Sequence, residues 1–121
     1  MLPRTTGFWI LVLVSLALAS AASAHAKLLE AQPRAGQILA AAPERIRLRF
    51  NETLEAPFSK IVLRDGHGVA LPSVAATVDT AHPDTLLLLP PPLPSGKYQL
   101  DWSTVTRDGH RTKGSVPFQV R

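Results

Sequence analysis

The chain has 121 residues, a formal net charge of +4 at pH 7 and no cysteine. This length favours one ordinary domain, and the lack of cysteine excludes disulfides, thiolate zinc sites, iron–sulfur clusters and thiol catalysis. The basic residues are scattered among few aromatic ones, which gives little support to nucleic-acid binding.

The first 24 residues have the pattern of a secretory signal peptide. Arg4 supplies positive charge, an apolar run extends from Phe8 to Leu18, and Ala22-Ser23-Ala24 fits a cleavage site. A transmembrane anchor is the alternative, but the apolar run is short for a span, which needs about 20 residues. We therefore expect residues 1–24 to be removed and residues 25–121 to form the exported domain, with no stable membrane insertion after cleavage.

The first elements of the exported part are a short turn and a strand. Residues 38–42 are expected to form a short helical turn that Pro43 ends. From Arg45 to Phe50 polar and apolar residues alternate, which predicts a strand whose apolar face carries Ile46, Leu48 and Phe50. This strand should form one wall of the core.

Short strand signals separated by turn signals continue to the end of the chain. Asp65-Gly66 is a hairpin signal, and Pro90–Pro94 is interpreted as a stiff crossover rather than a ligand for a proline-reading domain. The further strands are expected at 60–63, 69–71, 74–78, 85–89, 97–106 and 114–120. About seven short strands with turns between them predict an all-β sandwich or barrel.

Among the histidines, His25 stands out because cleavage after Ala24 would make it the first residue. Its α-amine and imidazole Nδ1 can then close a six-membered chelate on one metal ion. The alternative is that some residue must come first and histidine does so by chance. His67 and His82 fall in turn-like segments and are interpreted as loop residues.

The second candidate for metal binding is Asp108-Gly109-His110. Side chains two apart in an extended segment point to the same side, so the carboxylate and the imidazole would face a common point. The alternative is an ordinary Asp-Gly hairpin turn, and the same tripeptide at Asp65-Gly66-His67 shows how unspecific the motif is. With His25 the set becomes one amine, two imidazoles and one carboxylate. These donors suit tetragonal Cu(II), with nickel and zinc as competitors.

The exported part, taken as a whole, resembles the CopC copper-resistance family of periplasmic copper carriers. The resemblance starts at His25-Ala26-Lys27-Leu28, continues through Leu48-Arg49-Phe50, and is most specific at the end of the chain. There it rests on Gly96-Lys97-Tyr98-Gln99-Leu100-Asp101-Trp102, Asp108-Gly109-His110, Gly114 and Phe118-Gln119-Val120.

The resemblance implies an immunoglobulin-like Greek-key β-sandwich that binds one Cu(II) ion (Cu²⁺) in the periplasm, for copper homeostasis or resistance. The implied ligands are the amine and imidazole of His25, the imidazole of His110 and the carboxylate of Asp108. Glu52 falls where the family often has a glutamate near the metal, and would at most orient a ring or a water. The implied partner is an inner-membrane copper transporter of the CopD type, and the protein is expected to be a monomer without enzyme activity.

One departure from the family and two rival functions bear on this reading. Some family members carry a methionine-rich loop for Cu(I), whereas this chain has Met1 alone and Arg64-Asp65-Gly66-His67-Gly68 in the corresponding region. A Cu(I) site is therefore not expected. The rival functions are a copper monooxygenase with a histidine clamp, and an immunoglobulin-like interaction module without metal.

Overall fold

The computed structural model describes residues 26–73 and 75–121. The predicted signal peptide and His25 therefore lie outside the described residues. Within them the structure has eight strands and one short 3-10 helix. In chain order these are β1 (Leu28–Gln32), β2 (Gln37–Leu39), β3 (Ile46–Phe50), the 3-10 helix η1 (Ala56–Phe58), β4 (Lys60–Asp65), β5 (Thr77–Asp79), β6 (His82–Leu88), β7 (Gly96–Val105) and β8 (Arg111–Val120).

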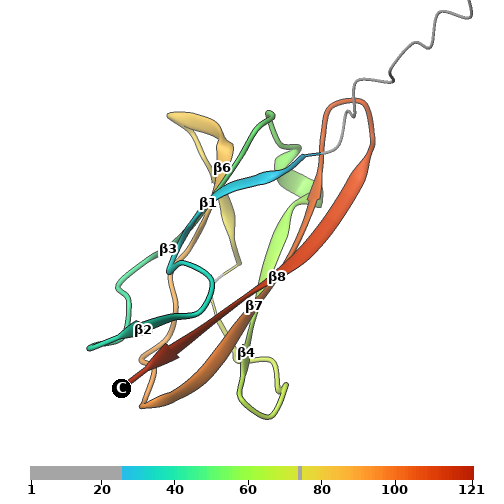
Figure 1. Ribbon diagram of the computed structural model, residues 1–121. Coiled ribbons are helices and arrows are strands. Elements are labelled where there is room, and N and C mark those ends of the chain that lie inside the picture. Colours follow the sequence, from blue (N-terminus) through green and yellow to red (C-terminus); the bar gives the residue numbers. More distant parts are fainter. Residues whose placement is uncertain (1–25, 74) are drawn as a thin grey trace, which may run out of the picture.

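The strands form two four-stranded sheets, which confirms the predicted all-β sandwich. One sheet has the order β1-β3-β6-β5 and the other the order β2-β8-β7-β4 (Figure 1). All the pairs are antiparallel except β2 with β8. The segment rich in proline between β6 and β7 leads from one sheet to the other, as a crossover should.

The core lies between the sheets and follows the alternation in the sequence. Ile46, Leu48 and Phe50 of β3 are fully buried, while the arginines between them face outward. Leu100 of β7 and Val116 of β8 meet this layer from the opposite sheet. The apolar face of each strand is removed from water in this arrangement, and that burial is the main favourable term in folding.

The longest element is the hairpin of β7 and β8, whose strands pair along their whole length from Gly96 opposite Val120 to Val105 opposite Arg111. Its turn lies at the end of the molecule where β1 begins (Figure 1). Midway along the hairpin Trp102 is paired with Gly114. The indole covers the Cα of this glycine so closely that a Cβ there would lie 2.5 Å from the Cζ2 atom of Trp102.

Near the start of the domain one prediction was wrong and one strand was missed. Residues 37–39 form the strand β2 rather than a helical turn, because they pair in parallel with 118–120 at the far end of the chain. β1 was not predicted at all. Its apolar residues do not alternate, and a register shift between Leu28 and Glu30 interrupts its pairing with β3.

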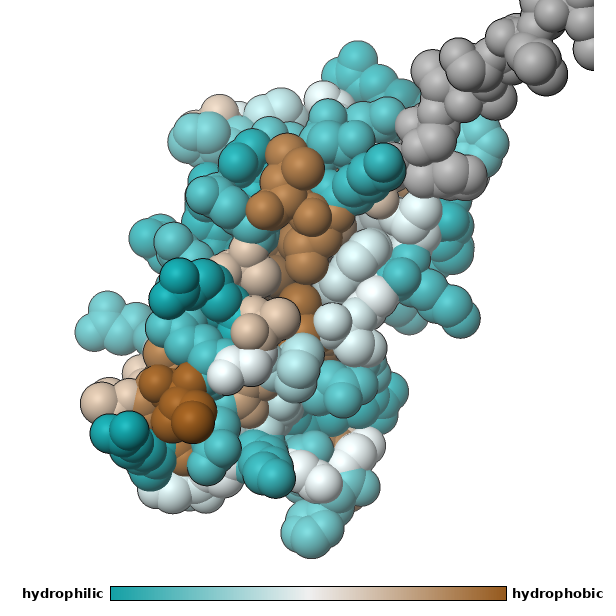
Figure 2. All heavy atoms as spheres, in the orientation of Figure 1, coloured by the Kyte–Doolittle hydropathy of each residue, from teal (hydrophilic) through white to brown (hydrophobic). Residues whose placement is uncertain are grey.

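The exposed surface is largely polar. Figure 2 shows a hydrophilic face with a narrow band of hydrophobic side chains and a smaller spot at the lower left. Leu29 of β1 and Ile38 of β2 are among the large apolar residues that stay about half exposed, as single apolar side chains on protein surfaces often do. In the part of the chain that the structure describes, no helix is long and apolar enough to cross a bilayer.

Candidate metal centre

The turn between β7 and β8 holds Asp108 and His110. The N–H of Gly109 donates to the carbonyl of Thr106 (2.9 Å), and the N–H of Thr106 donates to the carbonyl of His110 (3.1 Å). Gly109 has a φ of +84°, a conformation that glycine adopts without the usual steric penalty. The tripeptide is therefore a hairpin turn and not the extended segment that would place side chains two apart on one side.

The turn nevertheless brings the two side chains together. Nδ1 of His110 lies 2.8 Å from Oδ2 of Asp108, and both side chains are about half exposed. The other carboxylate oxygen, Oδ1, accepts a very short hydrogen bond from the hydroxyl of Thr106 and a longer one from the N–H of His110 (3.3 Å). The hydroxyl of Thr106, followed by the contact with His110, lowers the pKa of Asp108 to about 2. The lowered pKa extends the pH range of the charged carboxylate downward, and both of its oxygens are held by neighbours in the turn.

A charged carboxylate and an imidazole at this separation match the needs of a metal ion. Two neighbouring ligands of a tetragonal ion, each about 2.0 Å from the metal, are about 2.8 Å apart. The separation of 2.8 Å between Nδ1 of His110 and Oδ2 of Asp108 equals that edge. The same separation is that of an ordinary N–H···O hydrogen bond, and the two atoms could serve as ligands of one cation once the imidazole turns so that both lone pairs face it.

The same tripeptide at Asp65-Gly66-His67 is built differently. There Oδ1 of Asp65 accepts from the backbone N–H groups of His67 (2.8 Å) and Val69 (3.0 Å), so the carboxylate closes its own turn. The His67 side chain is exposed in this loop, as predicted. The two copies of one short motif show that tertiary surroundings, rather than the tripeptide, create the pair at Asp108 and His110.

Glu52 lies close to the turn in space. It follows β3, and with Thr53 it lines a shallow hollow of 300 Å³ whose other side is formed by Thr106, Arg107 and Asp108. Glu52 thus lies on the opposite side of the hollow from Asp108, and its role near a metal stays a prediction.

The start of the described chain is fixed beside the same turn. Ala26 is buried (4 % exposed), and its carbonyl accepts a hydrogen bond of 3.0 Å from the hydroxyl of Thr112, two residues after His110. His25 itself is outside the described residues. Among those that are described, no three His, Asp or Glu side chains are grouped closely enough to hold a metal. The turn thus supplies two donors, and a complete site needs donors from elsewhere.

Sequence reasoning missed the threonines of this region. The inward positions of β7 and β8, where the strand pattern calls for apolar residues, include Thr104 and Thr112, and Thr106 follows just after β7. Thr104 and Thr106 are almost completely buried. Buried hydroxyl groups need hydrogen-bond partners. Polar residues in an apolar register were therefore the signal that could have revealed them.

A second imidazole–carboxylate pair lies in the turn between β5 and β6. Nδ1 of His82 is 3.1 Å from Oδ2 of Asp79, and that carboxylate also accepts from the N–H of Ala81 (3.0 Å). His82 was interpreted as a loop residue, but it is the exposed first residue of β6. The pair closes the tight connection between the two strands, in keeping with its place in the hairpin.

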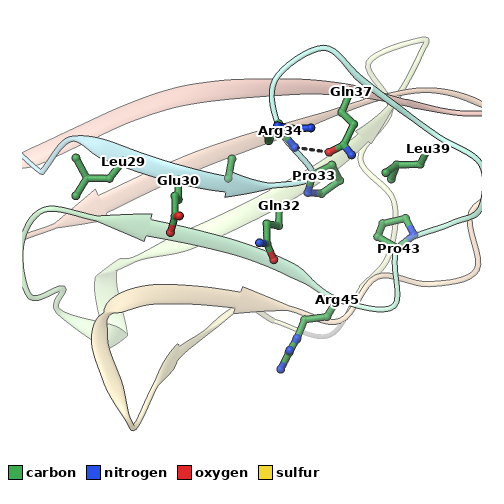
Figure 3. Close-up of a pocket in the computed structure, with 10 residues that line it drawn as sticks. Leu29, Glu30, Gln32, Pro33, Arg34, Gln37, Leu39, Pro43 and Arg45 are labelled. Atoms are coloured by element: carbon green, nitrogen blue, oxygen red, sulfur yellow. Dashed lines mark hydrogen bonds between the residues drawn. The ribbon is translucent and has the colours of Figure 1, made fainter.

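A hollow of 540 Å³ elsewhere on the molecule is unsuited to a cation. It lies beside β1 and β2, and Figure 3 shows Glu30, Gln32, Arg34, Gln37 and Arg45 around it. Its one carboxylate, Glu30, already accepts from Nε of Arg49 (2.9 Å), and no histidine contributes to the lining. The arginines would repel a metal ion, so the β7–β8 turn remains the candidate metal centre.

Comparisons with known proteins point to one family. The model of the CopC domain matches residues 28–121. Copper resistance protein C of Pseudomonas syringae pv. tomato is 35 % identical over the full length of both chains. The crystal structure of CopC from Methylosinus trichosporium OB3b superposes with a TM-score of 0.74 at 32 % identity, covering 79 % of this chain and 93 % of that one. Copper transport protein CutJ of Bacillus subtilis is 29 % identical over 93 % of this chain but only 21 % of its own length.

Proposed function

The chain belongs to the CopC domain family of copper-resistance proteins, and from this premise we propose that it holds one Cu(II) ion at the β7–β8 turn. The ligands would be the α-amine and imidazole of His25, the imidazole of His110 and the carboxylate of Asp108. The observation that carries the proposal is the 2.8 Å contact between Nδ1 of His110 and Oδ2 of Asp108, whose other carboxylate oxygen is held by the hydroxyl of Thr106.

The position of Ala26 supports the remaining two donors. Its carbonyl is bonded to Thr112, only two residues from His110, so Ala26, the residue that follows His25 in the sequence, lies next to the turn. Consecutive Cα atoms are about 3.8 Å apart. An amine and an imidazole on residue 25 would then be within reach of a metal at the turn. The four donors contain no sulfur, which favours Cu(II) over Cu(I).

The proposal requires that the signal peptide be cleaved after Ala24. In the 121-residue precursor the nitrogen of His25 is part of a peptide bond, and a peptide nitrogen is not an amine ligand. The intact site would form only in the exported protein, which we place in the periplasm as a monomer. Binding should weaken as the pH falls, because protons compete for the amine and the imidazoles.

In the cell we propose that the protein carries or sequesters copper for homeostasis or resistance. A CopD-type inner-membrane transporter is the proposed partner. Support comes from the Bacillus subtilis relative, which is named a copper transport protein and of which this domain matches only about one fifth. A domain of this kind joined to a larger transport protein suggests that separate chains also work together.

The test is a Cu(II) titration of the processed protein beside a variant that carries one extra alanine before His25. Trp102 is the only tryptophan between residues 25 and 121, so quenching of its fluorescence can report binding, and electron paramagnetic resonance can report the ligands. We expect a tetragonal signal rich in nitrogen that changes, with weaker binding, on extension. Identical spectra would refute the clamp, and oxidation of a polysaccharide with a reductant would assign a monooxygenase instead.

A further inference from the structure

Two threonine hydroxyls connect the first described residue to the interior of the β7–β8 hairpin. Thr104 and Thr112 are paired across the hairpin, and their Oγ1 atoms are 3.0 Å apart. The hydroxyl of Thr112 also donates to the carbonyl of Ala26 at 3.0 Å. A threonine hydroxyl has one hydrogen to give. Thr112 gives its hydrogen to Ala26, so Thr104 must donate to Thr112, and the direction of the whole chain of bonds is fixed.

The carbonyl of Ala26 belongs to the peptide group between residues 26 and 27, and a second hydrogen bond holds the N–H side of that group. The N–H of Lys27 donates to Oδ1 of Asn51 at 2.7 Å, and the N–H of Asn51 donates back to the carbonyl of Lys27 at 3.1 Å. The carbonyl of Ala26 and the N–H of Lys27 belong to one planar peptide group. Thr112 holds one edge of this plane from β8, and Asn51 holds the other edge from the end of β3.

Because both edges of the 26–27 peptide plane are bonded, the backbone that leads to His25, the first proposed ligand, has little conformational freedom. When both edges of the 26–27 peptide plane are fixed, only the two backbone torsions of Ala26 separate that plane from the peptide bond to residue 25. Ala26 is itself 4 % exposed, which restricts those torsions further. A chain end held in this way loses less conformational entropy when its donors bind a metal than a free end would.

We propose that Thr112 and Asn51 are positioning residues for copper, acting through the 26–27 peptide plane to present His25 to Asp108 and His110. The proposal rests on the proposed function, because it assigns these residues a role at that same site. Neither side chain needs to touch the metal. Their role is to raise affinity by holding the amino-terminal segment in place before the metal arrives.

The variant Thr112→Val removes the hydroxyl and keeps the branched shape, whereas Thr112→Ser keeps the hydroxyl. Asn51→Ala removes the second attachment at an exposed position. All are expressed as the full chain with its own leader, and the processed amino terminus is checked by mass spectrometry. We expect T112V and N51A each to weaken Cu(II) binding about fivefold, the equivalent of one hydrogen bond. T112S should bind within about twofold of the unaltered protein.

A double-mutant cycle shows whether Thr112 acts through the amino terminus. If it does, T112V should weaken binding in the protein that begins at His25 but not in the variant with an extra alanine before His25, because the clamp is already lost there. The metal-free protein gives a second readout, since the amide of Lys27 should exchange with solvent faster in T112V. Thr77→Val, an exposed threonine on β5 in the other sheet, is the matched control and should change neither quantity.

The outcomes separate the two proposals. If the unaltered protein binds Cu(II) tightly and extension weakens binding, but T112V and N51A bind equally well, the positioning role is wrong and the copper site stands. Equal effects of T112V with and without the extra alanine would also overturn the positioning role. If the unaltered protein does not bind Cu(II), both proposals are wrong.

Discussion

Replacing Gly114 by alanine should destabilise the domain by a steric clash with Trp102. The Cβ of the new residue would lie 2.5 Å from Cζ2 and 2.8 Å from Cε2 of the indole. Trp102 is 8 % exposed, and its ring packs edge-on against Phe50 with centroids 5.0 Å apart. Phe50 is itself fully buried, so the indole cannot move away from Gly114 without disturbing the core.

The size of the effect follows from two opposing terms. Overpacking of a core costs about 1–3 kcal/mol, while replacing glycine at a conformation open to alanine returns about 0.4–1 kcal/mol through the unfolded state. We therefore expect G114A to lower the free energy of unfolding by about 1–2 kcal/mol. In a domain of this size the Tm should fall by roughly 5–15 °C.

Urea unfolding followed by circular dichroism measures this free energy directly. Lys113→Ala, an exposed substitution one residue away on β8, is the control and should stay within about 0.5 kcal/mol of the unaltered protein. In the background of Trp102→Phe, whose ring is smaller, the cost of G114A should shrink by about 1 kcal/mol or more. An equal cost in both backgrounds, or none in either, would refute the packing argument.

Three further predictions concern the turn. Carbon NMR should give a pKa of about 2 for Asp108, and Thr106→Val should raise this pKa toward its ordinary value of 3.8; an unchanged pKa in T106V would contradict the role of the hydroxyl. Because the pKa of the folded state is the lower one, the stabilising contribution of this carboxylate is present above about pH 3.8 and is lost as the pH falls toward 2. In Cu(II) titrations His110→Ala should weaken binding by more than roughly 100-fold, the largest loss typical of removing a residue that only supports a ligand. His67→Ala, in the other copy of the tripeptide, should have no effect, and equal losses in the two variants would show that the β7–β8 turn is not the site. Glu52→Gln should weaken Cu(II) binding by about tenfold or less in the same titration, and a loss as large as that of H110A would make Glu52 a ligand.

Three strands could be predicted from the sequence because each has a regular alternating pattern. β3, β7 and β8 each place apolar residues at every second position over five or more residues, and burying those faces together determines their register. β2 could not be predicted. Its three residues have little pattern of their own and become a strand through parallel pairing with 118–120, about 80 residues away in the chain.

For the candidate site, too, some features follow from the sequence and others only from the tertiary structure. The sequence alone restricted the possible donor types, since the chain has no cysteine and Met1 is its one methionine, and the amino-terminal pattern makes His25 a proposed ligand. Only the tertiary structure decided which of two identical tripeptides forms a pair. Asp108 is held by the buried hydroxyl of Thr106 and meets His110, whereas Asp65 bonds to the backbone of its own turn.

The place of Ala26 and Lys27, the first described residues, was also decided by the tertiary structure alone. Nothing in the local sequence links Ala26 to Thr112, 86 residues later in the chain, or Lys27 to Asn51. Those bonds form because the sandwich brings the start of β1 beside the β7–β8 hairpin and the end of β3. The sequence thus supplied the donor types of the proposed copper site, and the packing of the two sheets supplied their common location.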